Sequence, residues 1–293
     1  MSAPAPCGRP LLVVIDPAAR RVDAESVRIV RDVLCAGAAA KICLPDGPEE
    51  TARALAHRGR RRPVVVGDDL ALRRIVALLH RERELAGAAL ALVPVGSPAA
   101  VAVARELGVP TDPVAAARAV LDGAERDLDL LVDDSDGVVL GGLSIPARTG
   151  RGSAAERDPW WAPPLRGCRS LVRNRRPGTA GPSGDEVQHR LRVEADGVLL
   201  VDLDRPVSDV SVSTSGPAAD GEDGLARIVV RPGGGRGGVP FTVHARAITV
   251  SGPDFHYRAD AVVGGPVRTR TWTVRPGALR LTLPHQAPPP AGS

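Results

Sequence analysis

The sequence predicts a two-domain protein in which a doubly wound parallel α/β domain precedes an antiparallel β-sandwich. From residue 11 to about 130, short apolar runs alternate with amphipathic stretches, as in a parallel sheet covered by helices. Beyond Asp127 the pattern changes to closely spaced strand-like runs, which are typical of an antiparallel sandwich. A chain of 293 residues is long enough to bury two modest cores. The predicted limits are 10–128 for the α/β domain and 129–285 for the sandwich.

The α/β domain is predicted from four apolar runs, each of which precedes a helical pattern. In the first helix Val27, Val30 and Leu34 recur on one face, and Gly37 lies where a helix would end. The predicted strands are 11–15, 41–44, 64–66 and 89–93, and the predicted helices are 25–35, 48–57, 70–83, 99–107 and 113–121.

The sandwich is predicted from nine strand-like runs separated by turn residues. These runs are 128–132, 137–140, 191–194, 198–203, 207–214, 226–230, 241–250, 255–263 and 269–274. Residues 149–185 are rich in Arg, Gly, Pro and Ser without an apolar period, so we expect a long, poorly ordered loop there. The Pro-rich segment 286–293 is expected to be a disordered tail.

Composition narrows the function classes. The net charge is +4 and the pI is about 9.3, but Lys41 is the only lysine and the arginines are scattered. This resembles the coding bias of a high-GC genome, and aromatic residues for base stacking are nearly absent, so no nucleic-acid partner is expected. The four cysteines have no C-x-x-C spacing, which favours the cytoplasm. The apolar run 11–15 is too short for a signal-peptide core or a membrane span.

Three predicted strands end in turns that carry small or acidic residues. The turns are Asp16-Pro17, Gly67-Asp68-Asp69 and Pro94-Val95-Gly96-Ser97. The carboxyl ends of parallel strands meet at one edge of a sheet, so these turns should lie side by side. Glycine lets backbone N–H groups approach phosphate closely. Taken singly, the first is an ordinary turn and the second a solvated helix N-terminus, but a strand that ends in such a turn before a helix is where α/β proteins bind phosphate groups.

Together the three turns resemble the nucleotide site of diacylglycerol kinases, sphingosine kinases and related lipid kinases. In that family the turns read Asn-Pro, G-G-D-G-T and P-x-G-T-x-N. Here Asp68, Leu70 and Ala71 replace Gly, Gly and Thr, and Ala99 replaces the last Asn. The resemblance implies an NAD-kinase-like nucleotide domain. We expect weaker ATP binding, because the Asp68 carboxylate repels phosphate and each added Cβ strains a turn that needs positive φ.

The resemblance continues into the second domain. Arg126-Asp127-Leu128-Asp129-Leu130 is similar to the family's R-x-I-D-L, and Asp223-Gly224-Leu225 matches its D-G-L. Asp260-Ala261-Val262 stands at the family's D-G-E, and Arg275-Pro276-Gly277-Ala278-Leu279 matches R-P-G-A-L. The resemblance implies that Asp260 is the general base on the lipid hydroxyl. We expect it to be exposed and to face the interdomain cleft, toward Asp69.

The implied activity is transfer of the γ-phosphate of ATP to a lipid hydroxyl, with ATP and Mg²⁺ as cofactors. The implied nucleotide-binding residues are Asp16, Gly67, Asp69, Gly96 and Ser97, with Asp69 also placing the metal. The lipid substrate would be met at a membrane surface, by a cytoplasmic protein peripheral to the inner face of the membrane. A homodimer is left open. The alternative is a catalytically inactive pseudokinase that binds nucleotide, lipid or protein.

Other chemistry has little support. The segment Asp133–Gly137 resembles a calcium loop but lacks the glutamate at the twelfth position, so we interpret it as a hairpin tip. The six histidines have no metal-ligand spacing. Ser97 and Ser144 lie in no G-x-S-x-G motif, which argues against serine hydrolase chemistry.

Overall fold

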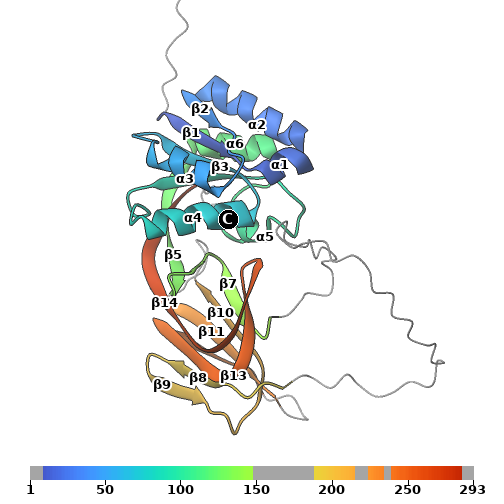
Figure 1. Ribbon diagram of the computed structural model, residues 1–293, viewed down its shortest axis with the longest axis vertical. Helices are drawn as coiled ribbons and strands as arrows, with labels where there is room; N and C mark the ends of the chain where they lie inside the picture. The colour runs from blue at the N-terminus through green and yellow to red at the C-terminus, as the bar shows by residue number, and fades with distance from the viewer. Residues whose placement is uncertain (1–8, 148–187, 215–223, 234–238, 286–293) are drawn as a thin grey trace, which may run out of the picture.

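The computed structural model describes residues 9–147, 188–214, 224–233 and 239–285, and it confirms the predicted fold class. An α/β body with parallel strands lies at one end of the elongated molecule, and a body of antiparallel strands lies at the other (Figure 1). The predicted loop 149–185 and the predicted tail 286–293 lie outside the described residues.

The α/β body is built on four parallel strands in the order β2-β1-β3-β4. Helices α2 and α6 pack together on one side of this sheet, and α4 covers the side that faces the second body (Figure 1). The strands are β1 (Leu11–Ile15), β2 (Ala40–Cys43), β3 (Arg62–Gly67) and β4 (Ala89–Pro94). The helices are α1 (Pro17–Val22), α2 (Ala24–Gly37), α3 (Pro48–Ala56), α4 (Asp69–Arg81), α5 (Ala102–Glu106) and α6 (Pro113–Asp122).

Local sequence explains where these helices begin. Asp23 accepts a hydrogen bond from the backbone N–H of Ser26 at 2.9 Å and caps α2, whose Val27, Val30 and Leu34 are buried. Asp112 caps α6 in the same way, and Pro113 occupies the first helical position, where no N–H is needed. Strands β1, β3 and β4 are buried along their whole length, as expected for a sheet covered on both faces.

The second body consists of antiparallel strands around a separate core. Strand β13 pairs with β14, β7 and β8, and the order continues from β7 through β10 and β11 to β12. The ring of Tyr257 meets that of Trp272 edge to face in this core, with centroids 5.1 Å apart. The strands are β5 (Ala124–Asp133), β6 (Val138–Val139), β7 (Gly142–Ile145), β8 (Arg192–Ala195), β9 (Val198–Val201), β10 (Val207–Thr214), β11 (Ala226–Pro232), β12 (Phe241–Ala245), β13 (Ala247–Ala259) and β14 (Val262–Leu283).

Two long strands join the bodies. Strand β14 pairs with β13 in the second body and then returns to the first, where Leu281 pairs in parallel with Leu90 of β4. Strand β5 runs antiparallel beside β14 through the predicted domain limit at residue 128. The leucines at positions 279, 281 and 283 are buried in the core of the α/β body. The chain end therefore completes the sheet with which the chain begins, which fixes the two bodies to one another.

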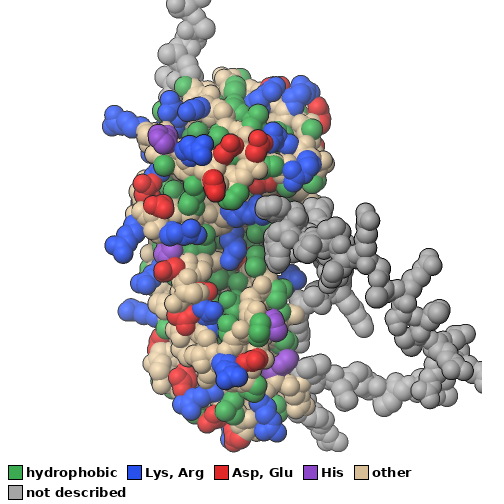
Figure 2. Space-filling model, in the orientation of Figure 1, with side chains coloured by type: hydrophobic (Ala, Val, Ile, Leu, Met, Phe, Trp, Pro, Cys, Tyr) green, Lys and Arg blue, Asp and Glu red, His purple; other side chains and the backbone are tan. Residues whose placement is uncertain are grey.

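On the face shown in Figure 2, positive and negative side chains are interspersed over both bodies. Among the described residues, no helix is both long enough and apolar enough to cross a membrane.

Candidate functional site

The three predicted turns meet at the carboxyl edge of the parallel sheet. Ile15 of β1 pairs with Val66 of β3, and Gly67 pairs with Pro94 of β4. The N–H of Asp16 donates to the carbonyl of Val66 at 2.9 Å, just beyond the paired residues. The prediction that Asp16, Gly67 and Gly96 lie side by side is therefore confirmed for the turns that carry them.

The turns pack so closely that Gly67 has no room for a side chain. A Cβ on Gly67 would lie 2.8 Å from the Cβ of Ala71 and 3.0 Å from the Cβ of Asp16. Gly96 is less crowded, since an added Cβ would lie 3.3 Å from the Cβ of Ala100 and 3.6 Å from that of Asp68. Gly67 thus allows the first helix turn of α4 to approach the end of β1.

Asp16 and Asp68 both cap helices at this edge. Asp16 caps α1 by accepting a hydrogen bond from the N–H of Ala18 at 2.7 Å, and its other oxygen lies 3.5 Å from a guanidinium nitrogen of Arg74. Asp68 caps α4 by accepting from the N–H of Ala71 at 2.9 Å. Its backbone is extended, with φ −88° and ψ −179°. The expectation that the turn needs positive φ at position 68 is therefore wrong, and the aspartate causes no backbone strain there.

Asp69 is buried, and both of its carboxylate oxygens accept hydrogen bonds. Its side chain accepts from the N–H groups of Val103 at 2.8 Å and Ala104 at 2.9 Å, and its own N–H donates to the carbonyl of Ala100. Burial raises the pKa of Asp69 to about 6, although the two backbone hydrogen bonds lower it. These contacts tie α5 to the first turn of α4. The metal-placing role of Asp69 stays a prediction.

Ser97 closes the turn between β4 and α5. Its hydroxyl accepts a hydrogen bond from the N–H of Ala100 at 3.3 Å, and its carbonyl accepts from the same N–H at 2.8 Å. The side chain is exposed at the carboxyl edge of the sheet.

Asp260 comes from the second body, where it occupies the hairpin between β13 and β14. It has a positive φ of 51°, a conformation that Asp adopts more readily than most residues. Its carboxylate accepts backbone hydrogen bonds from Leu140 and Gly141 at 2.8 Å each and from Gly142 at 3.2 Å. Asp260 therefore anchors the turn between β6 and β7. The sequence-based expectation of an exposed Asp260 is wrong, because this side chain is only partly accessible.

The electrostatics of Asp260 reflect this setting. Burial raises its pKa, while the three backbone hydrogen bonds and the charge of Arg73 lower it. The charge of Asp260 in turn contributes to the raised pKa of Asp69. The hairpin of Asp260 therefore lies against the turn at Gly141, which also approaches Val103 and Glu106 of the α/β body, and its orientation toward Asp69 stays a prediction. Its role as general base is a separate matter and stays a prediction.

Glu106, the last residue of α5, approaches the same turn from the α/β body. A Cβ placed on Gly141 would lie 3.5 Å from an Oδ of Asp260 and 3.5 Å from an Oε of Glu106. Gly141 thus separates two carboxylates that come from different bodies. Sequence reasoning missed Glu106, since a single surface glutamate beside a short helix has no distinguishing pattern.

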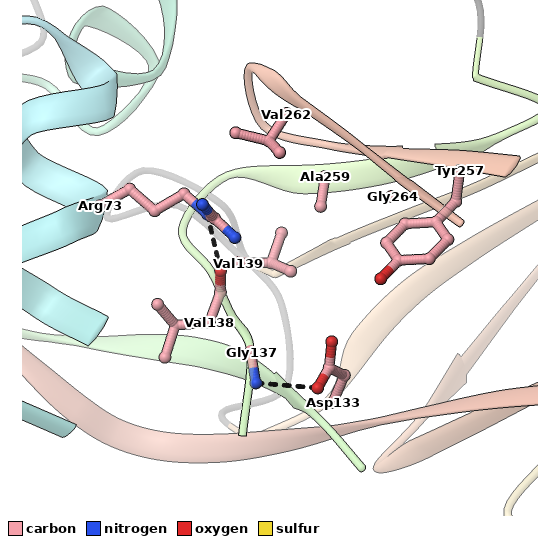
Figure 3. A pocket seen from close by; sticks show the side chains of 9 residues that line it. All are labelled: Arg73, Asp133, Gly137, Val138, Val139, Tyr257, Ala259, Val262 and Gly264. Atoms are coloured by element: carbon pink, nitrogen blue, oxygen red, sulfur yellow. Dashed lines mark hydrogen bonds between the residues drawn. The ribbon is translucent and has the colours of Figure 1, made fainter. Parts of the chain in front are cut away.

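A small cavity lies between α4 and the second body (Figure 3). Its volume is about 50 Å³, and its lining includes Arg73, Tyr257 and the two residues that flank the hairpin tip, Ala259 and Val262. The Nε of Arg73 donates to the carbonyl of Val138 at 3.3 Å and so joins α4 to β6 (Figure 3). A cavity of this size holds water molecules but is far smaller than a typical ligand pocket of roughly 300 Å³ or more.

The described residues contain no group of three or more His, Cys, Asp or Glu side chains that could hold a metal ion. The carboxylates of Asp16 and Asp68 cap helices, and that of Asp69 accepts hydrogen bonds from two N–H groups of α5. These residues do not form a metal cage of their own.

Comparison with known proteins identifies the fold. No protein-family model matches the sequence, and no curated protein sequence matches it. Solved structures do match over nearly the whole chain. Two are described as a "putative diacylglycerol kinase" from Bacillus anthracis str. Sterne: one has 13% identity, a TM-score of 0.67 and coverage of 94% of this chain and 98% of its own. The other has 15% identity, a TM-score of 0.68 and coverage of 97% and 98%.

A third structure, described as a diacylglycerol kinase from the same organism, has 13% identity, a TM-score of 0.60 and coverage of 95% and 98%. The TM-scores and the coverage establish a shared fold, and at identities this low they establish the fold alone. The chain thus shares the fold of these structures over nearly the whole of its length.

Proposed function

We propose that this protein is an ATP-dependent lipid kinase of the diacylglycerol kinase type, which transfers the γ-phosphate of ATP to a lipid hydroxyl. The observation that carries the proposal is the likeness of fold to solved diacylglycerol kinases over nearly the full length of both chains. The meeting of the three strand-ending turns at the carboxyl edge of the parallel sheet supports it, and so does the approach of the Gly141 turn of the second body to Val103 and Glu106 of the α/β body.

In this proposal ATP lies along the turns of Asp16, Gly67, Gly96 and Ser97, at the edge where α/β sheets bind ligands. Asp68 is the unfavourable element, because its carboxylate adds negative charge beside phosphates. Mg²⁺ bound to the ATP phosphates would reduce that repulsion and neutralise charge that develops during phosphoryl transfer.

The acceptor lipid would approach between the two bodies, where carboxylates of Asp260 and Glu106 flank Gly141. The nearby cavity beside Arg73 and Tyr257, at about 50 Å³, is too small to hold a lipid headgroup. We propose that the protein meets its lipid on the inner face of the membrane as a peripheral cytoplasmic protein.

The experiment presents full-length protein with radiolabelled ATP, Mg²⁺ and phosphatidylcholine vesicles that carry diacylglycerol or sphingosine. The proposal predicts a labelled lipid from at least one acceptor and no label when Mg²⁺ or acceptor is omitted. Folded protein that binds ATP, measured by calorimetry, but labels neither lipid would contradict this kinase assignment and favour the pseudokinase alternative.

A further inference from the structure

Arg73 extends from α4 toward the second body. Its Nε donates a hydrogen bond to the carbonyl of Val138 at 3.3 Å, and its side chain lines the cavity that Ala259 and Val262 also line (Figure 3). Within the part of the chain that the structure describes, no carboxylate forms an ion pair with its guanidinium group. The positive charge of Arg73 is therefore not neutralised by a direct neighbour.

Arg73 and Asp260 hold the same short segment of the second body. This segment, residues 138–142, runs from β6 into β7. Arg73 binds the carbonyl at its start, whereas the Asp260 carboxylate accepts from three N–H groups at its end. The N–H of Asp260 also donates to the carbonyl of Gly142 at 2.9 Å. Arg73 and Asp260 are therefore connected through one short stretch of backbone.

The charge of Arg73 acts on the Asp260 carboxylate. Burial raises the pKa of Asp260, while the backbone hydrogen bonds and the charge of Arg73 lower it. Two negative charges act against ionisation of Asp260: Glu106 approaches it from α5, and Asp69 and Asp260 each disfavour the charge of the other. Among the described side chains, Arg258, two residues earlier on β13, forms no ion pair with Asp260. Arg73 is thus a cation that opposes the effect of burial on this carboxylate.

Helix α4 connects Arg73 to the edge where ATP is proposed to bind. The helix begins at the Asp68 cap, and Asp69 in its first turn holds α5. Arg73 follows Asp69 by four residues, so the two side chains lie on one face of the helix, one turn apart. Arg73 therefore joins the helix of the nucleotide edge to the segment that Asp260 holds.

We propose that Arg73 is a positioning residue for the phosphoryl transfer, because it holds the 138–142 segment against α4 and keeps the Asp260 carboxylate ionised. The inference rests on the proposed kinase activity with Asp260 as the base. In that reaction the hydroxyl oxygen of the lipid forms a bond to the γ-phosphorus of ATP. The bond from that phosphorus to the β,γ-bridging oxygen breaks, its electron pair leaves with ADP, and the hydroxyl proton passes to Asp260. Arg73 itself touches none of the reacting atoms.

The first test measures how kcat/KM for the lipid depends on pH in the vesicle assay. Asp260 accepts a proton only when it is ionised, so activity falls as the pH drops through its pKa. Without the charge of Arg73 the ionised form is less favoured, and the fall moves to higher pH. We expect its midpoint to rise by about 0.5 pH unit or more in Arg73→Gln, since an opposite charge close by shifts a carboxyl pKa by about 1–3 and a more distant one by less.

Two variants serve as controls for this profile. Arg73→Lys keeps the positive charge and should stay close to the wild-type midpoint. Arg81 ends the same helix and is exposed, so Arg81→Gln should have the wild-type profile. KM for ATP should be the same in all four proteins, because none of the changes removes an ATP contact. An unchanged midpoint in Arg73→Gln would overturn the inference, whatever the rate of that variant.

A second measurement does not depend on activity. ¹³C NMR of protein labelled at the aspartate carboxyl carbons follows the titration of Asp260, whose signal is the one that Asp260→Asn lacks. The inference predicts that this titration moves to higher pH in Arg73→Gln but not in Arg81→Gln. An unchanged Asp260 titration in folded Arg73→Gln would overturn the inference and leave the kinase assignment intact. A wild type that phosphorylates no lipid would overturn the kinase assignment, and with it the role of Arg73 in phosphoryl transfer.

Discussion

Replacing Asp260 with Asn tests whether this side chain anchors the turn between β6 and β7. The carboxylate accepts from the N–H groups of Leu140, Gly141 and Gly142. An amide has one acceptor oxygen, and its NH₂ group would face an N–H of the turn. Asn tolerates the positive φ of 51° at position 260 about as well as Asp does, so the backbone adds little to the cost.

The magnitude follows from the hydrogen bonds lost. A hydrogen bond to a charged group contributes about 1.5–3 kcal/mol, and a buried donor left unpaired costs about 1–3 kcal/mol. Burial raises the pKa of Asp260, which shows that the charged form is itself disfavoured, so part of this loss is offset. We therefore expect Asp260→Asn to lower the free energy of unfolding by about 2 kcal/mol.

The assay is urea unfolding followed by circular dichroism. Asp254→Asn serves as the control, because Asp254 is exposed and, among the described residues, its carboxylate forms a surface ion pair with Arg268 alone, at 2.9 Å. Such pairs contribute about 0–1 kcal/mol. If Asp260→Asn matched the control within about 0.5 kcal/mol, the three backbone hydrogen bonds would not anchor the turn and the reasoning would be refuted.

Three further predictions address the sheet edge and the second core. Asp68→Gly should strengthen ATP·Mg²⁺ binding several-fold in a calorimetric titration, because it removes a repelling carboxylate. The lost helix cap should lower the free energy of unfolding by only a few tenths of a kcal/mol. Equal affinities would show that Asp68 does not face the phosphates. In the folded protein the pKa of Asp69 is about 6, against an ordinary value of 3.8, so folding favours the protonated carboxyl group. The contribution of this group to the free energy of unfolding is therefore fully present below pH 3.8 and is lost as the pH rises toward 6. The stability of the wild type relative to Asp69→Asn should therefore fall by roughly 1–3 kcal/mol between pH 4 and pH 7, and a constant difference would contradict the raised pKa. Gly264→Ala should lower the free energy of unfolding by about 1–3 kcal/mol, and with it the melting temperature, because the added Cβ would lie within 3 Å of the Tyr257 ring. An unchanged melting temperature would show that the ring moves away without cost.

The sequence was sufficient to predict the α/β body and the place where its turns converge. Buried runs that end in Asp16, Gly67 and Pro94 are local signals, and the geometry of parallel sheets then brings their carboxyl ends together. The pairing of Leu281 with Leu90 could not be predicted in this way. It joins residues far apart in the chain, and nothing in the local pattern of β14 identifies β4 as its neighbour.

Individual carboxylates were harder to interpret than the fold. The sequence shows two adjacent aspartates after Gly67, but not that Asp68 caps α4 while Asp69 turns inward to hold α5. That choice depends on where α5 packs, and α5 is too short to have a clear helical period. For the same reason no pattern identified Glu106, and the burial of Asp260 depends on a turn more than a hundred residues earlier in the chain.

The most direct test of the kinase assignment uses two glycine variants in the vesicle assay with radiolabelled ATP and Mg²⁺. A methyl group on Gly67 would collide with Ala71 and Asp16, whereas one on Gly87, in the loop before β4, would have 3.7 Å to its nearest neighbour. We predict that wild type and Gly87→Ala phosphorylate the lipid at equal rates and that Gly67→Ala loses at least 90% of the activity, roughly the effect of 1.4 kcal/mol on the barrier. Absence of lipid phosphorylation by the folded wild type, or equal activity of all three proteins, would contradict the account.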